Sequence, residues 1–553
     1  MSTPWWHGAV IYHVYPLSFS DSDGDGFGDL PGLLSRLDYV AGLGVDAIWI
    51  SPFYPSPMKD FGYDITDHCD VHPAMGTLDD FDAIVRRAHT LGLKVLIDQV
   101  WSHTSDQHPW FQDSRMARES AASERYVWAD PRPDGTPPNN WLSVFGGSAW
   151  TWSPVRRQYY LHHFLSSQPA LNLRSDVVVA ALFACARFWL DRGVDGFRFD
   201  AVDFMFHDVE LRDNPPRPPA DGMVPPRPFR LQHHVHDMMG TETRDFLCRL
   251  GAVVRAYDGV VTLGELSSEE GALERCAAYT SPAGTALDIA YTLGMMKQDF
   301  TPEVFARALA AVEHTSGIGN CWAFSNHDVA RACSRWGGAH GGGHFACLLM
   351  ALLLSLPGTV CLYQGEELGL PQAEIPESRL RDPFGTAFYP VFTGRDGSRT
   401  PMPWTAAGRH AGFSSARNAW LPVPRAHRER AVDRQAGDAR SLLSAWRNFL
   451  RWRRAHPSLV RGTLTALRAD GSLLSFERVL GEERVLAAFN FSDKPATLPV
   501  ENLTLTPLGS HAFATDPKRK VVVLQGYGVL FARLAAGSPV SGGQQGALQT
   551  TGN

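Results

Sequence analysis

Short runs of β-branched and aromatic residues recur along most of the chain, and stretches with helical periodicity separate them. This alternation is typical of βα units that build a parallel sheet. Eight such runs predict a closed (β/α)8 barrel, the TIM-barrel architecture, with helices outside the strands. The expected strands are 10–15, 47–51, 95–98, 196–200, 260–264, 285–289, 321–325 and 359–363, and the expected helices include 78–91 and 177–192.

Two insertions interrupt this alternation, and both follow the C-terminal end of a strand, where barrel enzymes assemble their sites. Residues 102–174 are rich in Trp, Pro, Gly and polar residues, which predicts a loop-rich lobe, subdomain B, after the third strand. Residues 203–240 carry seven prolines from Pro215 to Pro228, too many for a helix or central strand, and are predicted to form a lid. The barrel would then comprise 1–101 and 175–460.

The pattern changes beyond residue 460. Alternating runs at 473–478, 484–490 and 520–524 predict an all-β C-terminal domain, a β-sandwich over 461–536. Residues 537–553 contain Gly, Ser, Gln and Thr with almost no bulky apolar residue, so a disordered tail is expected there.

The composition excludes several classes of protein. A formal net charge of -7 with 20% charged residues calls for neither nucleic acid nor an anionic membrane. Eight scattered cysteines, without a C-x-x-C pair, favour free thiols in a reducing compartment. The N-terminus lacks the features of a secretory signal, and the longest apolar run, 345–356, is too short for a membrane span. We therefore expect a cytoplasmic monomer or homodimer.

Three predicted strands end in an acidic residue or are followed closely by one. In the fourth, period-two alternation places Arg198 and Asp200 on the same side, and an arginine there keeps the carboxylate ionised. The fifth ends in Glu265, and the seventh is followed by Asp328. Each acid alone fits an interior ion pair equally well, but three that converge suit glycoside cleavage. That reaction uses one carboxylate to attack and one carboxylic acid to protonate the leaving oxygen.

Four stretches, in order and at plausible spacing, resemble glycoside hydrolase family 13, the α-amylase family, in its α-glucosidase and oligo-1,6-glucosidase branch. They are 98–103 (DQVWSH), 196–200 (GFRFD), 264–265 (GE) and 324–328 (FSNHD). The resemblance implies that Asp200 is the nucleophile, Glu265 the general acid/base and Asp328 the acid that binds the sugar hydroxyls. It further implies that the subsite of the transferred sugar is lined by His103, Arg198 and His327.

Two further segments, 59–64 (KDFGYD) and 394–404 (GRDGSRTPMPW), resemble those that close the inner end of the pocket in this branch. The resemblance implies that Asp60 and Arg399 close it, that Tyr63 stacks on a terminal glucose, and that Phe145 and Phe164 form aromatic walls. A closed end admits a terminal sugar alone. For each aromatic residue, packing in the core is the alternative.

The loop 21–29 (DSDGDGFGD) has oxygen-bearing residues at positions 1, 3, 5 and 9 of an EF-hand-like loop, with glycine at position 6. Gly32 stands where such a loop has a bidentate Glu, so it is not a full EF-hand. The resemblance implies a structural Ca2+ or Mg2+ bound by Asp21, Asp23, Asp25, the Phe27 carbonyl and Asp29. A solvated acidic turn is the alternative.

The expected activity is that of a retaining, exo-acting α-glucosidase on short α-glucosides, with transglucosylation possible. The chain has Ser102 where many relatives have Asn, and Ala201 where Val accompanies α-1,6 and Thr α-1,4 cleavage. The small alanine favours α-1,4 or broad specificity. The alternatives are a sucrose-acting isomerase or transglucosylase of the same family, and a non-catalytic barrel protein.

Overall fold

The computed structural model describes residues 3–218, 227–267, 271–280, 285–314, 317–337, 342–500, 505–507, 513–516 and 521–535. Eight parallel strands form one sheet in the order β10-β11-β1-β2-β3-β7-β8-β9. A bridge between Ala290 of β9 and Asn320, just before β10, nearly closes the ring, which confirms the predicted barrel. Its strands are β1 (Val10–Val14), β2 (Ala47–Ile50), β3 (Lys94–Gln99), β7 (Gly196–Phe199), β8 (Val261–Leu266), β9 (Ile289–Thr292), β10 (Cys321–Ala323) and β11 (Thr359–Tyr363).

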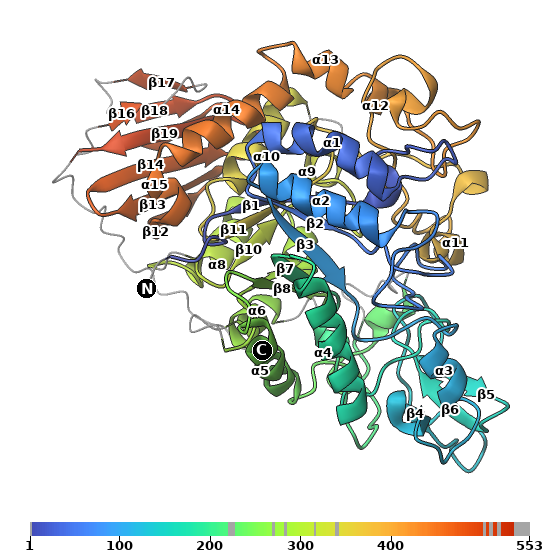
Figure 1. Cartoon of the computed structure of the whole chain (residues 1–553). Helices are drawn as coiled ribbons and strands as arrows, with labels where there is room; N and C mark the ends of the chain where they lie inside the picture. The colour runs from blue at the N-terminus through green and yellow to red at the C-terminus, as the bar shows by residue number, and fades with distance from the viewer. Residues whose placement is uncertain are drawn as a thin grey trace.

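The barrel strands are buried on both faces, as parallel strands are when helices cover the sheet. Helices α1, α2 and α4 flank the strands on the outside (Figure 1). The start of α2 is fixed by a capping box, in which Thr77 and Asp80 each accept a backbone N–H of the other. The helices of the barrel are α1 (Leu30–Leu43), α2 (Leu78–Thr90), α4 (Asp176–Leu190), α5 (Thr243–Val254), α6 (Ala272–Tyr279), α7 (Leu293–Met296), α8 (Pro302–Ala310), α9 (Ala332–Gly337), α10 (Gly343–Leu353) and α14 (Leu442–Arg454).

The sixth barrel strand starts later than the sequence predicts. We expected 285–289, whereas β9 spans Ile289–Thr292, and the other seven strands agree to within two residues at each end. The Asp288 carboxylate accepts hydrogen bonds from the backbone N–H and the hydroxyl of Thr262, at 2.9 and 2.8 Å. Asp288 thereby ties the segment before β9 to the base of β8. Pairing between β8 and β9 starts with Leu263 opposite Ile289, one residue after Asp288 and Thr262. The apolar pattern of the sequence does not reveal this start.

The first insertion forms a lobe between β3 and α4. It contains α3 (Pro109–Ser114), η2 (Ser123–Arg125) and an antiparallel sheet, in the order β4-β6-β5, of β4 (Trp128–Ala129), β5 (Trp150–Ser153) and β6 (Gln158–Leu161). Its small core includes Trp141, Trp150 and Leu161. In Figure 1 the lobe projects from the barrel, away from the C-terminal sheets.

The second insertion, after β7, begins with η3 (Val202–Phe204) and includes η5 (Pro228–Leu231). Pro219, Pro225 and Pro226 of the predicted lid lie outside the described residues. Of its neighbouring histidines His233, His234 and His236, His234 stacks on Phe229 at 3.6 Å and lies 2.7 Å from the Asp237 carboxylate. This histidine is therefore a packing residue of the segment.

The C-terminal part is all-β, as predicted, and its strands pair antiparallel. A five-stranded sheet has the order β12-β13-β14-β19-β16, and a three-stranded sheet the order β15-β18-β17. Leu473, Leu486 and Leu530 of the larger sheet share an apolar cluster with Val522 and Leu524 of the smaller one. The strands are β12 (Thr463–Asp470), β13 (Leu473–Leu480), β14 (Glu483–Asn490), β15 (Ala496–Pro499), β16 (Leu505–Pro507), β17 (Phe513–Asp516), β18 (Val521–Leu524) and β19 (Val529–Leu534).

The predicted tail, 537–553, lies outside the described residues. Of the helices that the structure describes, none combines the length and the apolarity that crossing a membrane requires. The segments between β11 and the C-terminal sheets contribute short helices: α11 (Pro383–Phe388), α12 (Arg425–Arg428), α13 (Val432–Ala436) and α15 (Pro457–Arg461).

Candidate active site

The three predicted acids line one pocket at the C-terminal end of the barrel strands. Asp200 directly follows β7, Glu265 is the penultimate residue of β8, and Asp328 lies in the loop after β10. The pocket has a volume of about 720 Å³ and also exposes Asp60, Tyr63, His103, Phe145 and Phe164. Eight of the eleven predicted catalytic and substrate-binding residues therefore share a single cavity. Arg198, His327 and Arg399 lie behind its lining and contact its carboxylates.

Arg198 is fully buried and holds the two central acids together. Its Nη1 donates to Asp98 at 2.6 Å and to Asp200 at 2.7 Å, and its Nη2 donates to Glu265. Two acids bound by one guanidinium lie close to each other, as attack and proton donation at a single glycosidic bond require. Arg198 also receives support from the ring of Trp49, whose centroid lies 4.9 Å from its Cζ.

Glu265 is buried, and this sets its protonation. Burial raises the pKa of Glu265 well above its usual range, and although Arg198 opposes this effect, Asp200 and Asp328 raise the pKa further. A carboxyl group held neutral in this way can donate a proton near neutral pH. Asp98, equally buried, has its pKa raised to about 7 by burial despite the contact with Arg198.

The pKa of Asp328 is shifted in the opposite direction to that of Glu265. Its Oδ1 accepts from Arg395 at 3.0 Å and from Arg399 at 2.9 Å, and its Oδ2 lies 3.2 Å from His327 Nε2. Burial by itself would raise the pKa of Asp328, but the guanidinium groups of Arg395 and Arg399 hold it well below its usual range. Asp328 is therefore an ionised acceptor for sugar hydroxyls.

Asp60 and Arg395, which both line the pocket, form an ion pair. Asp60 Oδ1 accepts from Arg395 Nη2 at 2.6 Å, and Asp60 Oδ2 accepts from Gln168 at 3.0 Å. Arg395 is fixed in turn by Asp382, whose carboxylate lies 2.8 Å from the same nitrogen. The arginine that faces Asp60 is thus Arg395 in place of the expected Arg399, four positions later in the same segment.

Tyr63 and the two histidines form one packed group. The Tyr63 ring stacks on His327 with centroids 5.1 Å apart, and its hydroxyl donates to Asp98 at 3.1 Å. His103 Nε2 lies 2.9 Å from the Tyr63 carbonyl, and its Nδ1 lies 2.9 Å from Ser102 Oγ. Ser102 therefore makes a direct contact with this histidine. Burial lowers the pKa of both His103 and His327, so both imidazoles are neutral near pH 7.

Two series of aromatic rings lead outward from the inner end. Phe164 lies 5.3 Å from His103 and 5.1 Å from Phe204, measured between ring centroids. Phe145 lies 4.7 Å from Phe384, and Arg395 sits over its other side at 5.0 Å. Both predicted wall residues thus face the pocket while also packing against neighbouring rings.

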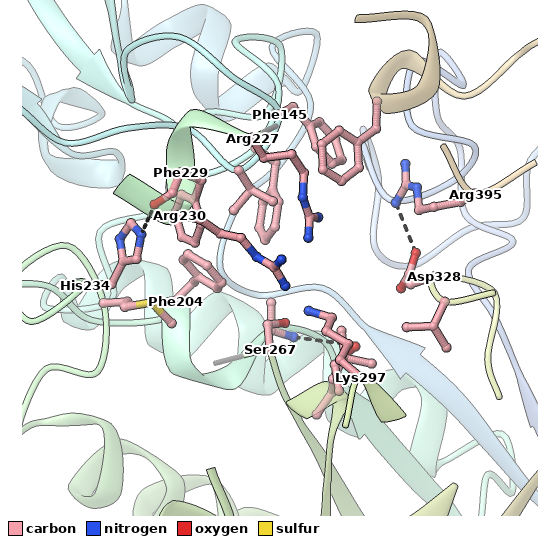
Figure 2. A pocket seen from close by; sticks show the side chains of 18 of the residues that line it. Phe145, Phe204, Arg227, Phe229, Arg230, His234, Ser267, Lys297, Asp328 and Arg395 are labelled. Carbon is pink, nitrogen blue, oxygen red and sulfur yellow. Dashed lines mark hydrogen bonds and ion pairs between the residues drawn. The ribbon is translucent and has the colours of Figure 1, made fainter. Parts of the chain in front are cut away.

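Several pocket residues escaped the sequence reasoning. Arg395 lines the pocket, and Asp382 and Gln168 hydrogen-bond to the Arg395–Asp60 pair, yet no local pattern singles these three residues out. The pocket lining also includes Arg227, Arg230 and Lys297 (Figure 2). Ala201, directly after Asp200, also lines the pocket and has the left-handed backbone conformation, with φ 43°.

The acidic loop near the N-terminus brings together part of the predicted ligand set. Carboxylate oxygens of Asp21, Asp23 and Asp29 lie within 4.8 Å of one another, which suits a hard cation. These oxygens also accept backbone N–H bonds, for example from Gly26 to Asp21 at 2.9 Å. Asp25 is not in this cluster of described residues, and its carboxylate accepts from Phe27 N at 2.7 Å.

A barrel whose strand ends bring a buried acid and a neighbouring carboxylate into one pocket has the arrangement that enzymes cleaving glycosides use. Residues 13–462 match the α-amylase catalytic-domain family. A probable α-glucosidase of Rhizobium meliloti (strain 1021) is 50% identical over 538 residues, which are 96% of this chain and 97% of that protein. The chain belongs to the α-amylase family and is a glycoside hydrolase.

Two solved structures share the whole fold. The α-glucosyl transfer enzyme XgtA is 49% identical, with a TM-score of 0.92, and the match covers 97% of this chain and all of that one. The trehalulose synthase MutB from Pseudomonas mesoacidophila MX-45 is 30% identical, with a TM-score of 0.86, over 97% of this chain and all of its own. Close relatives thus differ in the reaction that their names state.

Proposed function

We propose that this protein is a retaining, exo-acting α-glucosidase that also transfers glucose to alcohols. The observation that carries the proposal is the ion pair between Asp60 and Arg395, which closes the pocket behind the three acids. A pocket closed by this ion pair holds one terminal sugar, and the leaving group then lies toward the open side of the pocket.

The side chains divide the reaction between them. Asp200, paired with Arg198 at 2.7 Å, attacks the anomeric carbon, and Glu265 protonates the departing oxygen. The C–O bond to the leaving group breaks, and a glucosyl ester with Asp200 forms. Glu265, now a carboxylate, then takes the proton of water or an alcohol, whose oxygen displaces Asp200. Two inversions leave the product with the α configuration of the substrate.

The close approach of Asp200 and Glu265 to a single guanidinium supports the retaining route, because the inverting route needs room for a water molecule between acid and base. The sugar hydroxyls would be bound by Asp328 and His327. The apolar faces of the sugar would pack against Tyr63, Phe145 and Phe164. Preference for α-1,4 linkages is proposed from the space that Ala201 leaves beside Asp200.

We also propose a structural divalent cation at Asp21, Asp23 and Asp29. The donors are hard carboxylate oxygens, and each retains a lone pair beside the backbone N–H it accepts. A bound cation would offset the mutual repulsion of the loop carboxylates. Asp29 also caps the start of α1, so the cation would stabilise that helix start.

The second candidate function is transfer as the main activity. It is favoured by the similarity to XgtA, whose name states glucosyl transfer, and to MutB, a trehalulose synthase. Hydrolysis and transfer share the same glucosyl ester, so the fate of that intermediate decides between them.

Product analysis tests the proposal. The protein is incubated separately with maltose, isomaltose and sucrose, with and without an added alcohol, and the products are separated by chromatography. We expect glucose from maltose, with the α anomer appearing first by NMR, and an α-glucoside of the alcohol. Release of the β anomer, or cleavage of longer chains away from their ends, would contradict the proposal. Isomerised sucrose as the main product would favour the second candidate.

A further inference from the structure

Tyr291 of β9 stands next to Glu265 in the barrel sheet but does not belong to the described lining of the pocket. In the register of β8 and β9, Glu265 is paired with Tyr291, and paired residues of neighbouring strands point to the same side of a sheet. Tyr291 is buried, and its ring lies 6.1 Å from that of Trp49, over which Arg198 is placed. Any effect of Tyr291 on the reaction must therefore act through another residue.

The hydroxyl of Tyr291 binds the guanidinium of Arg198. Its oxygen accepts from Nε at 3.3 Å and from Nη2 at 3.2 Å. The other N–H groups of this arginine are used by carboxylates, because Nη1 donates to Asp98 and Asp200, and Nη2 donates to Glu265. A guanidinium has five N–H donors, so all five are engaged. Tyr291 supplies the neutral acceptor among the four partners.

A phenol suits this position because it stays uncharged. Burial raises the pKa of Tyr291 well above its usual range; Arg198 lowers it in part, and Glu265 raises it further. A neutral oxygen satisfies two buried N–H groups, which are costly to leave without partners, and adds no negative charge beside Glu265. Phenylalanine would fail the first requirement, and a carboxylate the second.

We propose that Tyr291 is a positioning residue, whose hydroxyl oxygen holds the Arg198 guanidinium so that one of the two Nη2 hydrogens, and not both, is directed at Glu265. The inference rests on the double-displacement function proposed above, in which Glu265 first gives a proton and later takes one. A carboxyl group with this double role must not be bound too firmly by a cation, because each further N–H bond to its carboxylate favours the ionised form.

Loss of the hydroxyl would release two buried N–H groups of Arg198. Nη2 would then direct its second hydrogen to Glu265, the carboxyl group that it already contacts. This change lowers the pKa of Glu265. The other charged groups that act on Glu265 are Asp98 of β3, Asp200 after β7 and Asp328 after β10, and the substitution leaves all three in place.

The test compares Tyr291→Phe with the wild type, with kcat and KM for maltose measured as a function of pH. The alkaline limb of kcat/KM should move to lower pH by about half a unit or more. At pH 7, kcat should fall about 3 to 10 fold. KM should change little, because Tyr291 does not line the pocket.

A second measurement is independent of how much of the variant is folded. The ratio of kcat/KM for maltose to kcat/KM for 4-nitrophenyl α-glucoside should fall in Tyr291→Phe, because 4-nitrophenolate departs with little help from an acid. Tyr12→Phe is the matched control. Tyr12 is buried in barrel strand β1, and its hydroxyl donates to Glu367 at 2.8 Å. Its replacement should leave both the alkaline limb and the ratio unchanged.

The outcomes separate this inference from the proposed function. If the wild type releases no glucose from either α-glucoside, the proposed function fails. If the wild type is active, but the alkaline limb of Tyr291→Phe stays in place or moves to higher pH, or the ratio is unchanged, the positioning role of Tyr291 is refuted while the proposed function stands.

Discussion

Arg198 donates to Asp200 across 2.7 Å, and the two residues stand two positions apart at the end of one barrel strand. Alternation along β7 directs both side chains into the barrel, where Arg198 also meets Asp98 and Glu265. The guanidinium therefore sets the spacing of nucleophile and acid.

Replacing Arg198→Lys tests this arrangement. An ammonium group keeps the charge but cannot bridge Asp98, Asp200 and Glu265 with fixed geometry. We expect kcat/KM for maltose to fall by at least about 10 to 100 fold, which corresponds to one lost hydrogen bond between charged groups. Arg192→Lys serves as control, because Arg192 pairs with Asp82 away from the pocket. Equal, small effects in both variants would contradict the role of Arg198.

The raised pKa of Glu265 makes a prediction about pH. As a general acid, Glu265 is active while protonated, so activity should decline as the pH rises through its raised pKa. In Glu265→Gln, this alkaline decline should disappear and kcat for maltose should fall about 10² to 10⁴ fold. An unchanged alkaline limb in the variant would assign it to another group, such as Asp98, whose pKa is about 7.

Arg395 should contribute to both stability and binding. Its removal leaves the buried carboxylates of Asp60 and Asp382 without their guanidinium partner. We expect Arg395→Ala to lower the free energy of unfolding by about 3 to 5 kcal/mol, measured by chemical denaturation. Its KM for maltose should rise as well. For Arg425→Ala, which breaks the exposed pair with Glu429, the change should stay within about 1 kcal/mol. Comparable losses in both variants would refute the structural role of Arg395.

Much of this site was predictable because it is local to strand ends. Asp200, Glu265 and Asp328 each follow or end an apolar run, and the barrel alone brings such positions to one face. Arg198 was found by alternation within a single strand. These predictions depend only on where a strand ends and on which side of it each residue lies, and both follow from the local sequence.

The parts that escaped prediction depend on contacts between distant segments. Arg395 and Arg399 lie four residues apart in one loop, and the fold alone decides which of them faces Asp60, 335 residues before Arg395. Arg227, in the insertion after β7, packs over the ring of Phe384 in α11, which lies far away in the sequence. The start of β9 depends on a side-chain tie from Asp288 to Thr262, which hydrophobic periodicity does not register.

The proposed cation predicts a dependence of stability on divalent ions. Thermal unfolding of chelator-treated protein should move to higher temperature when Ca2+ or Mg2+ is restored, because a ligand that binds the folded state alone stabilises it. Asp23→Asn should lose most of this shift, while Asp113→Asn, at an exposed carboxylate in subdomain B, should keep it. A wild-type unfolding temperature indifferent to both ions would argue against the site.

Chemical rescue of a variant without the Asp200 carboxylate shows whether Asp200 is the nucleophile. Asp200→Gly is supplied with an activated α-glucoside and azide, and the products are identified by NMR. Because azide enters the space left by the carboxylate and attacks once, we predict β-glucosyl azide from a variant that no longer turns over maltose. Undiminished maltose hydrolysis by Asp200→Gly would contradict the account.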